Sequence, residues 1–162
     1  MNDRIFAVLA RLAMSHADPV QPDAVFRAVD QALQETVSHT LFTILTYDRT
    51  MTESTRVYSN RESEYPRGGR KKIVSSRWAN QLLDEGTPFI GNDAQDLREV
   101  FFDHEVIRSL GCESVLNMPV RWQGRTIATL NLLHTANWYK DVHLDFMTCA
   151  AQLTAPALLM SV

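Results

Sequence analysis

The feature that most constrains the fold is a pair of long, largely apolar runs separated by a two-residue turn. The runs span residues 114–122 and 125–134, and Gln123-Gly124 joins them. A two-residue connection that contains glycine predicts a β-hairpin, because glycine adopts the backbone angles of tight hairpin turns. Both faces of this hairpin are apolar in the middle, whereas a solvated face would be polar. We therefore expect both sides of the sheet to be covered.

The pairing that follows from a two-residue turn assigns the side chains to faces. It sets Met118 opposite Thr129 and Leu116 opposite Asn131, and cross-strand partners share a face. Ser114 lies on the same face. We predict an apolar pocket over this face, with Ser114, Thr129 and Asn131 as its polar groups. The competing interpretation is a filled core, with Thr129 and Asn131 bonded to neighbouring backbone. A turn longer by one residue would exchange the faces.

Patterns elsewhere in the chain add helices at both ends and strands between them. Apolar residues at helical spacing predict three helices, over residues 2–15, 22–37 and 141–160. Runs rich in β-branched and aromatic residues predict three further strands, over residues 40–48, 54–60 and 87–91. Strands joined by hairpins, with helices at both ends, favour an α+β fold in which helices pack on an antiparallel sheet.

The middle of the chain, residues 61–111, is predicted to cover the face opposite the terminal helices. It begins with a loop over 61–72, and a helix over 75–86 follows, with a serine cap at its start and Gly86 at its end. Asp93 and Asp103 can each cap a further helical turn. A loop-rich cover leaves space over the sheet, and its apolar side chains would complete the pocket. The candidates from this segment are Trp78, Phe89, Phe101, Phe102 and Ile107.

Composition excludes several other classes of protein. The 162 residues suit one domain, with a helix and linker over 1–20 before a core over 21–162. A net charge of −3 gives no overall electrostatic case for nucleic acid or membrane binding. Two cysteines are too few for a disulfide scaffold, and no cluster suggests a metal site. Charged residues interrupt any export signal near the start, so we expect a cytoplasmic protein.

Residues 107–158 resemble the C-terminal half of a GAF domain. The matching features are Gly111, Ser114, the apolar strand 115–120, Gly124, the strand 126–133, Trp138 or Tyr139, and the helix from about 141. The resemblance implies an antiparallel sheet between a helical layer and a ligand-binding cover. It also implies a sensory or regulatory module that pairs through the terminal helices. We expect this module to be non-catalytic, with an unidentified small-molecule ligand and a possible signalling partner on a separate chain. Members of the family bind cyclic nucleotides, haem, bilins or oxoacids, so the resemblance does not identify a cofactor here.

Two alternatives remain open. One branch of the family, the free methionine-R-sulfoxide reductases, uses a nucleophilic cysteine, for which Cys112 is the candidate. The spacing of "GCES" differs from theirs, and Glu113 would raise the pKa of a neighbouring thiol. We interpret Cys112 and Cys149 as inert buried thiols. The second alternative is an interaction module with a filled core and no ligand.

Overall fold

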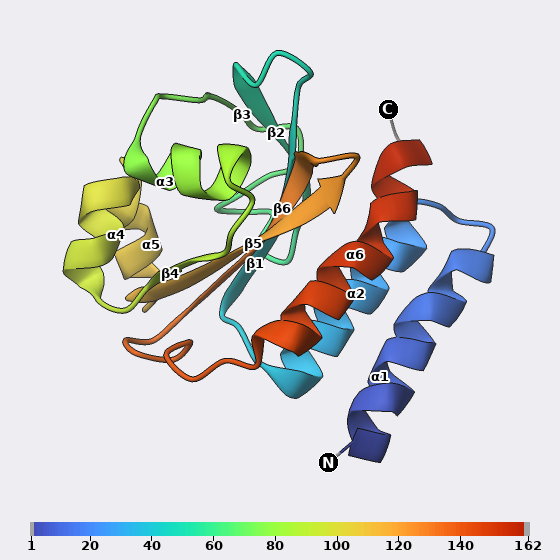
Figure 1. The fold of residues 1–162 in the computed structure, drawn as a ribbon. Coiled ribbons are helices and arrows are strands. Elements are labelled where there is room, and N and C mark those ends of the chain that lie inside the picture. The colour runs from blue at the N-terminus through green and yellow to red at the C-terminus, as the bar shows by residue number, and fades with distance from the viewer. Residues whose placement is uncertain (1, 161–162) are drawn as a thin grey trace.

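A six-stranded antiparallel sheet forms the middle layer of the protein (Figure 1). The computed structural model describes residues 2–160. The strands are β1 (Leu41–Tyr47), β2 (Glu53–Ser59), β3 (Arg70–Lys72), β4 (Phe89–Gly91), β5 (Ser114–Trp122) and β6 (Arg125–His134). Their order across the sheet is β3-β2-β1-β6-β5-β4, so the predicted hairpin lies beside the first strand. The predicted α+β antiparallel fold is confirmed. The short strand β3 corrects the prediction that residues 61–72 are entirely loop.

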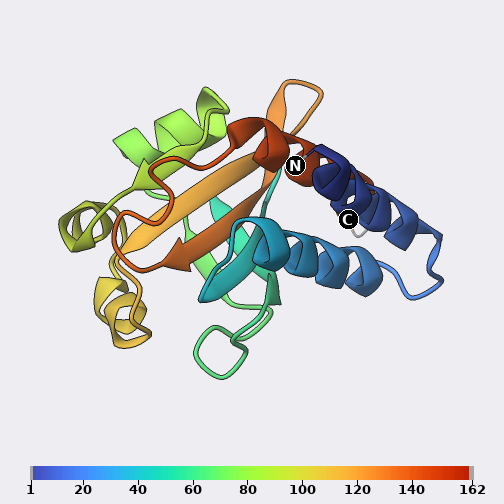
Figure 2. The same ribbon diagram turned by 90° about the horizontal axis from the view of Figure 1, so that it is seen from below.

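Two long helices pack on one face of the sheet, and a third lies outside these two (Figures 1 and 2). They are α1 (Asn2–Met14), α2 (Asp23–Thr36) and α6 (Leu144–Met160), with a short 3-10 turn, η1 (Ser15–Ala17), after the first. All three helices were predicted, with boundaries within three residues. The helices α2 and α6 bury apolar side chains against the sheet, and α1 buries its apolar stripe against α2 and α6. This burial is the main force that holds the three helices in place.

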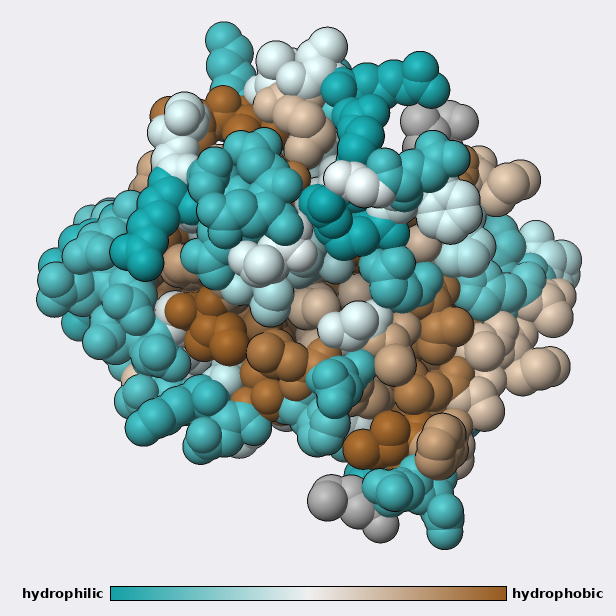
Figure 3. All heavy atoms as spheres, in the orientation of Figure 1, coloured by the Kyte–Doolittle hydropathy of each residue, from teal (hydrophilic) through white to brown (hydrophobic). Residues whose placement is uncertain are grey.

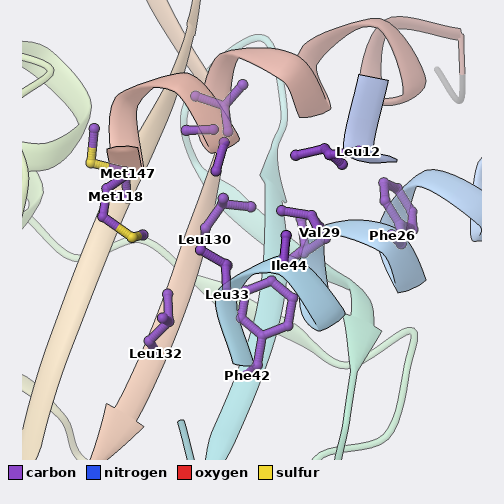
Figure 4. Packing of buried hydrophobic residues seen from close by; sticks show 14 of the residues in the cluster. Leu12, Phe26, Val29, Leu33, Phe42, Ile44, Met118, Leu130, Leu132 and Met147 are labelled. Carbon is purple, nitrogen blue, oxygen red and sulfur yellow. The ribbon is translucent and has the colours of Figure 1, made fainter. Parts of the chain in front are cut away.

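The core between these helices and the sheet is built from residues of both layers (Figure 4). Leu12 comes from α1, Val29 and Leu33 from α2, and Phe42 and Ile44 from β1. All five are almost fully buried. Truncating one such side chain to alanine typically costs about 2–5 kcal/mol, because it removes apolar contact and leaves a cavity.

The cover over the opposite face is made of short helices and loops. They are α3 (Arg77–Ala79), the π-helical turn η2 (Asn80–Asp84), α4 (Ala94–Val100) and α5 (His104–Ser109). The Ser76 hydroxyl caps α3, and the Asp93 carboxylate caps α4, as predicted. Asp103 precedes α5 without a side-chain capping bond, which corrects the prediction for that residue. Its carboxylate points to other partners, described below.

The register of the β5–β6 hairpin differs from the prediction by one residue over most of its length. Trp122 pairs with Arg125 and the turn has two residues, as predicted. Between that pair and Val120↔Ala128 the register shifts, which leaves Ile127 as the extra residue of a β-bulge. A one-residue shift moves side chains to the opposite face. Beyond the bulge, Asn131 therefore pairs with Asn117. The prediction paired Asn131 with Leu116.

The shift places part of the predicted pocket face in the helical core. Leu116 and Met118 pack against the terminal helices, and Figure 4 shows Met118 there with Leu130 and Leu132. Ser114 is fully buried, and its hydroxyl donates to the backbone carbonyl of Thr135 at 2.7 Å. These three assignments were wrong because the sequence pattern contains no sign of the bulge.

Candidate functional site

A cavity of about 290 Å³ lies between the sheet and the cover. This volume is at the small end of the range for small-molecule sites. Its walls are mostly apolar and aromatic. The lining residues with aromatic rings are Tyr47, Tyr65, Trp78, Phe101 and Phe102. Leucine, isoleucine and valine side chains from β1, β6, α4 and α5 fill much of the remaining wall.

A chain of amide hydrogen bonds forms the polar part of the cavity floor. The indole N–H of Trp78 donates to Asn117 Oδ1 at 2.9 Å, and Asn117 Nδ2 donates to Asn131 Oδ1 at 2.7 Å. Asn131 Nδ2 then donates to the backbone carbonyls of Thr129 at 3.2 Å and Thr43 at 3.3 Å. Each buried amide thus has partners, as buried polar groups require. The chain also links the cover, through Trp78, to three neighbouring strands.

A second polar contact closes one side of the floor. The hydroxyls of Tyr47 and Thr129 lie 2.8 Å apart. Burial raises the pKa of Tyr47 well above its usual range, and the hydrogen bond to Thr129 opposes that shift. Tyr47 is therefore a neutral phenol, and Thr129 is occupied by it and does not line the cavity.

Charged side chains form the wall under β2 and β3. Arg56 is only 8% exposed, its guanidinium lies 4.9 Å from the centre of the Tyr65 ring, and its Nη1 donates to the Pro66 carbonyl at 3.0 Å. Tyr65 donates through its hydroxyl to Asp103 Oδ2 at 2.9 Å, and Lys71 Nζ lies 3.2 Å from the same oxygen. This group of four, Arg56, Tyr65, Lys71 and Asp103, is called the charged wall below.

The sequence matches a known family model over most of its length, and the fold described above agrees with that match. The family model of the GAF domain matches residues 22–158. The chain belongs to the GAF domain family. A search of curated proteins finds no match. Comparison with solved structures finds GAF domains of low sequence identity, which support the fold alone.

Three of the solved structures, two of them GAF domains, show how much of the fold is shared. The GAF domain of an Acinetobacter phosphoenolpyruvate-protein phosphotransferase has a TM-score of 0.74 at 12% identity, covering 99% of this chain and 96% of that one. The corresponding domain from Coxiella burnetii has a TM-score of 0.72 at 15% identity, with coverage of 97% and 94%. A domain of a putative two-component sensor histidine kinase from Sinorhizobium meliloti 1021 has a TM-score of 0.63 at 17% identity, with coverage of 85% and 89%.

Within this GAF domain, the predicted site residues divide into two groups. Trp78, Phe101, Ile107 and Asn131 line the cavity. Thr129 lies beside it, and Ser114, Leu116 and Met118 lie elsewhere. Phe102, expected as part of the cover, is at the rim and is 81% exposed, with Lys71 Nζ 4.6 Å from its ring centre. Whether the lining residues bind a ligand stays a prediction.

The charged wall as a group of four residues was not predicted from the sequence. Arg56 and Lys71 belong to a basic stretch, residues 56–77, whose sequence favours a solvated loop paired with an acidic neighbour over a basic rim that attracts an anionic ligand. Asp103 was predicted to cap a helix. Arg56 reaches the cavity face because β2 has its own bulge, which pairs Arg56 with Leu45 while Tyr58 pairs with Ile44 on the helical side. A basic residue inside a strand is the one signal that could have indicated it.

The two cysteines have different surroundings. Cys112 is 2% exposed in a small apolar cluster with Leu41, Ile107 and Leu133, and it does not line the cavity. Burial raises the pKa of its thiol to about 11. Cys149 is exposed on α6, which corrects the prediction that it is buried.

Two further searches concern membranes and metals. Among the described residues, no helix has both the length and the apolar character that a membrane span requires. Residues 2–160 also contain no cluster of three or more histidine, cysteine, aspartate or glutamate side chains arranged to hold a metal ion.

Proposed function

We propose that this GAF domain is a non-catalytic sensory or regulatory domain whose cavity binds a small molecule. The observation that carries the proposal is the cavity itself. It combines an apolar, aromatic wall with a few convergent polar groups, which is the usual form of a small-molecule site. The structures it resembles include a domain of a sensor histidine kinase and GAF domains of phosphotransferases, which fits a regulatory role.

The cavity argues against the interaction module with a filled core. A closely packed protein interior has few voids larger than a water molecule. Here about 290 Å³ stays open beside a buried guanidinium. A module that only bound other proteins would gain stability if larger apolar side chains filled this space.

The thiol argues against the reductase. A nucleophilic cysteine must be a thiolate that substrate can reach. Cys112 is buried outside the cavity, and its raised pKa keeps it protonated near neutral pH. The geometry therefore favours binding over sulfoxide reduction.

The outer surface of the helical layer favours a homodimer. Phe6 is 69% exposed and Met14 70% exposed, and they lie eight residues apart on one face of α1 with Ala10 and Ala13. The lower right of Figure 3, over α1 and α6, is mostly tan and brown. Contiguous apolar surface of this kind marks interaction sites. We propose that a second copy of the chain covers it, and that a separate signalling protein reads the assembly.

A thermal-shift experiment tests ligand binding. Small-molecule fractions of a cell extract are added to the wild-type protein and to Leu133→Trp. This substitution replaces a leucine side chain that lines the cavity with a larger indole ring. A ligand at 100 times its Kd stabilises the protein by about 2.7 kcal/mol, or about 5–10 °C in a chain of this size. We expect such a shift in the wild type and none in Leu133→Trp.

The matched control for this experiment is Leu132→Met. Leu132 is the neighbouring residue on the helical side of β6, so its variant should respond as the wild type does. No shift in any fraction, or an equal shift in Leu133→Trp, would count against a ligand in the cavity.

A further inference from the structure

The charges of the cavity wall do not balance. Arg56 and Lys71 are cationic and Asp103 is anionic, which leaves one positive charge in excess. Lys71 already forms the ion pair with Asp103, and no carboxylate among residues 2–160 lies within ion-pair distance of Arg56. Lys72, which is exposed at the rim, adds a further positive charge. Arg56 is the buried charge of this wall, and buried charges are normally paired, so the wall favours one negative charge from outside the chain.

Arg56 also carries a buried hydrogen-bond donor that has no partner within residues 2–160. Arg56 Nη1 donates to Pro66, and the guanidinium packs on the Tyr65 ring. Arg56 Nε is buried and has no hydrogen-bond partner among the described residues. A planar guanidinium with a free N–H beside an apolar cavity is suited to a carboxylate, because the charge-assisted bond satisfies both groups.

Asp103 carries a buried hydrogen-bond acceptor that has no partner among the described residues. Its Oδ2 accepts from both Tyr65 and Lys71, whereas Oδ1 is buried without a partner in the part of the chain that the structure describes. Oδ1 requires an N–H or O–H donor. The negative charge of a ligand carboxylate would neutralise the excess positive charge of the wall. A cationic donor on the same ligand would cancel that gain, so a neutral donor fits the wall better.

We propose that the cavity binds a small aromatic monocarboxylate that also carries a neutral N–H or O–H donor. Its carboxylate pairs with Arg56, its donor bonds to Asp103 Oδ1, and its planar body lies between Trp78 and Phe101 and the apolar side chains of Leu41 and Leu133. This inference names the ligand class for the proposed sensor, and it rests on that proposed function. It applies to the charged wall of this chain, not to the fold.

Binding requires a small movement of the wall. Arg56 Nε and Asp103 Oδ1 lie just behind the cavity surface, where adjoining side chains shield them. Two unmet hydrogen bonds favour a local shift of the guanidinium and the carboxylate toward a ligand that satisfies both. Phe102 is exposed at the rim with its ring against Lys71, and it can fold over the ligand as the wall rearranges.

Isothermal titration calorimetry with four matched compounds tests the assignment. Indole-3-acetate has the carboxylate, the planar body and a donor-only N–H. 1-Naphthaleneacetate lacks the N–H, indole-3-ethanol lacks the charge, and L-tryptophan adds an ammonium group. We expect indole-3-acetate to bind best, with at least tenfold weaker binding of indole-3-ethanol and several-fold weaker binding of the other two. Equal binding of indole-3-ethanol, or tighter binding of L-tryptophan, would overturn the assignment.

Two variants separate the charge from the donor. Arg56→Gln should weaken binding of both acids at least tenfold and leave indole-3-ethanol unchanged, which also shows that the cavity is intact. Asp103→Asn should remove the preference for indole-3-acetate over 1-naphthaleneacetate, because its single amide oxygen stays occupied by Tyr65 and Lys71. Arg70→Gln, on the exposed side of β3, is the matched control and should change neither affinity. Unchanged acid binding in Arg56→Gln contradicts the proposal.

A result that rules out the proposed ligand class can be distinguished from a result that rules out ligand sensing itself. If native mass spectrometry recovers a bound molecule without a carboxylate, ligand sensing stands and the ligand class proposed here is wrong. If neither the four compounds nor any extract fraction binds, both proposals fall together.

Discussion

Asn131 is the residue on which the polar floor of the cavity depends most. Its oxygen accepts from Asn117, and its nitrogen donates to backbone carbonyls on β1 and β6. Removing it leaves a buried amide N–H of Asn117 without a partner. The cost of such an unsatisfied group is about 1–3 kcal/mol.

We therefore expect Asn131→Ala to lower the free energy of unfolding by about 2 kcal/mol, measured by urea denaturation. Gln31→Ala, an exposed amide on α2, is the matched control and should change it by less than about 0.5 kcal/mol. A loss in Asn131→Ala no larger than in this control would show that the amide chain does not stabilise the fold.

Cys112 gives the protein a defined response to alkaline pH. The folded state holds its thiol protonated with a pKa of about 11, whereas an unfolded thiol ionises near 8.5. The folded state thus binds more protons above about pH 8.5, so stability must fall as the pH rises through this window. The raised pKa values of the buried tyrosines keep those groups from titrating in the folded protein there.

From pH 8 to pH 9.5, the wild type should lose about 1 kcal/mol of stability that Cys112→Ala keeps. Urea denaturation at each pH under reducing conditions measures the difference between the two proteins. Parallel pH profiles would mean that the thiol is not desolvated as described.

At the scale of elements, the β5–β6 turn determines where the hairpin register begins. Gln123 has φ of 49° and Gly124 has φ of 75°, so both turn residues are left-handed. Glycine and asparagine tolerate this conformation, and glutamine does so less well.

Gly124→Ala should therefore destabilise the protein by about 1 kcal/mol, and Gln123→Asn should stabilise it by a few tenths. Thermal unfolding of the two variants gives opposite signs if the turn has the described angles. Shifts of the same sign in both would contradict this turn geometry.

The elements of this chain were predictable because each rests on local patterns. The helical stripes, the hairpin turn and the Asp93 cap all depend on residues close in sequence. The faces of the strands were not predictable, since they depend on bulges that single residues, Val57 and Ile127, create in β2 and β6. For this reason Asn131 was assigned to the cavity face but its partner Asn117 was missed. The Arg56–Asp103 wall joins residues 47 positions apart, which no local pattern could bring together.

For the whole molecule, the apolar outer face of α1 predicts assembly. Phe6→Glu with Met14→Glu should convert a dimer to a monomer, measured by light scattering, because the substitutions place charge in the proposed contact. Val74→Glu, an exposed apolar residue at the cavity rim, is the matched control and should leave the dimer intact. A wild-type protein that is monomeric at micromolar concentration would refute the homodimer.

We expect a small molecule to occupy the cavity between the sheet and its cover. Native mass spectrometry of the freshly purified protein tests it most directly. We expect the wild type and Leu132→Met to carry a small added mass that denaturation releases, and Leu133→Trp to lack it. The bare chain mass in all three, or the same added mass in Leu133→Trp, would show that no small molecule occupies this cavity.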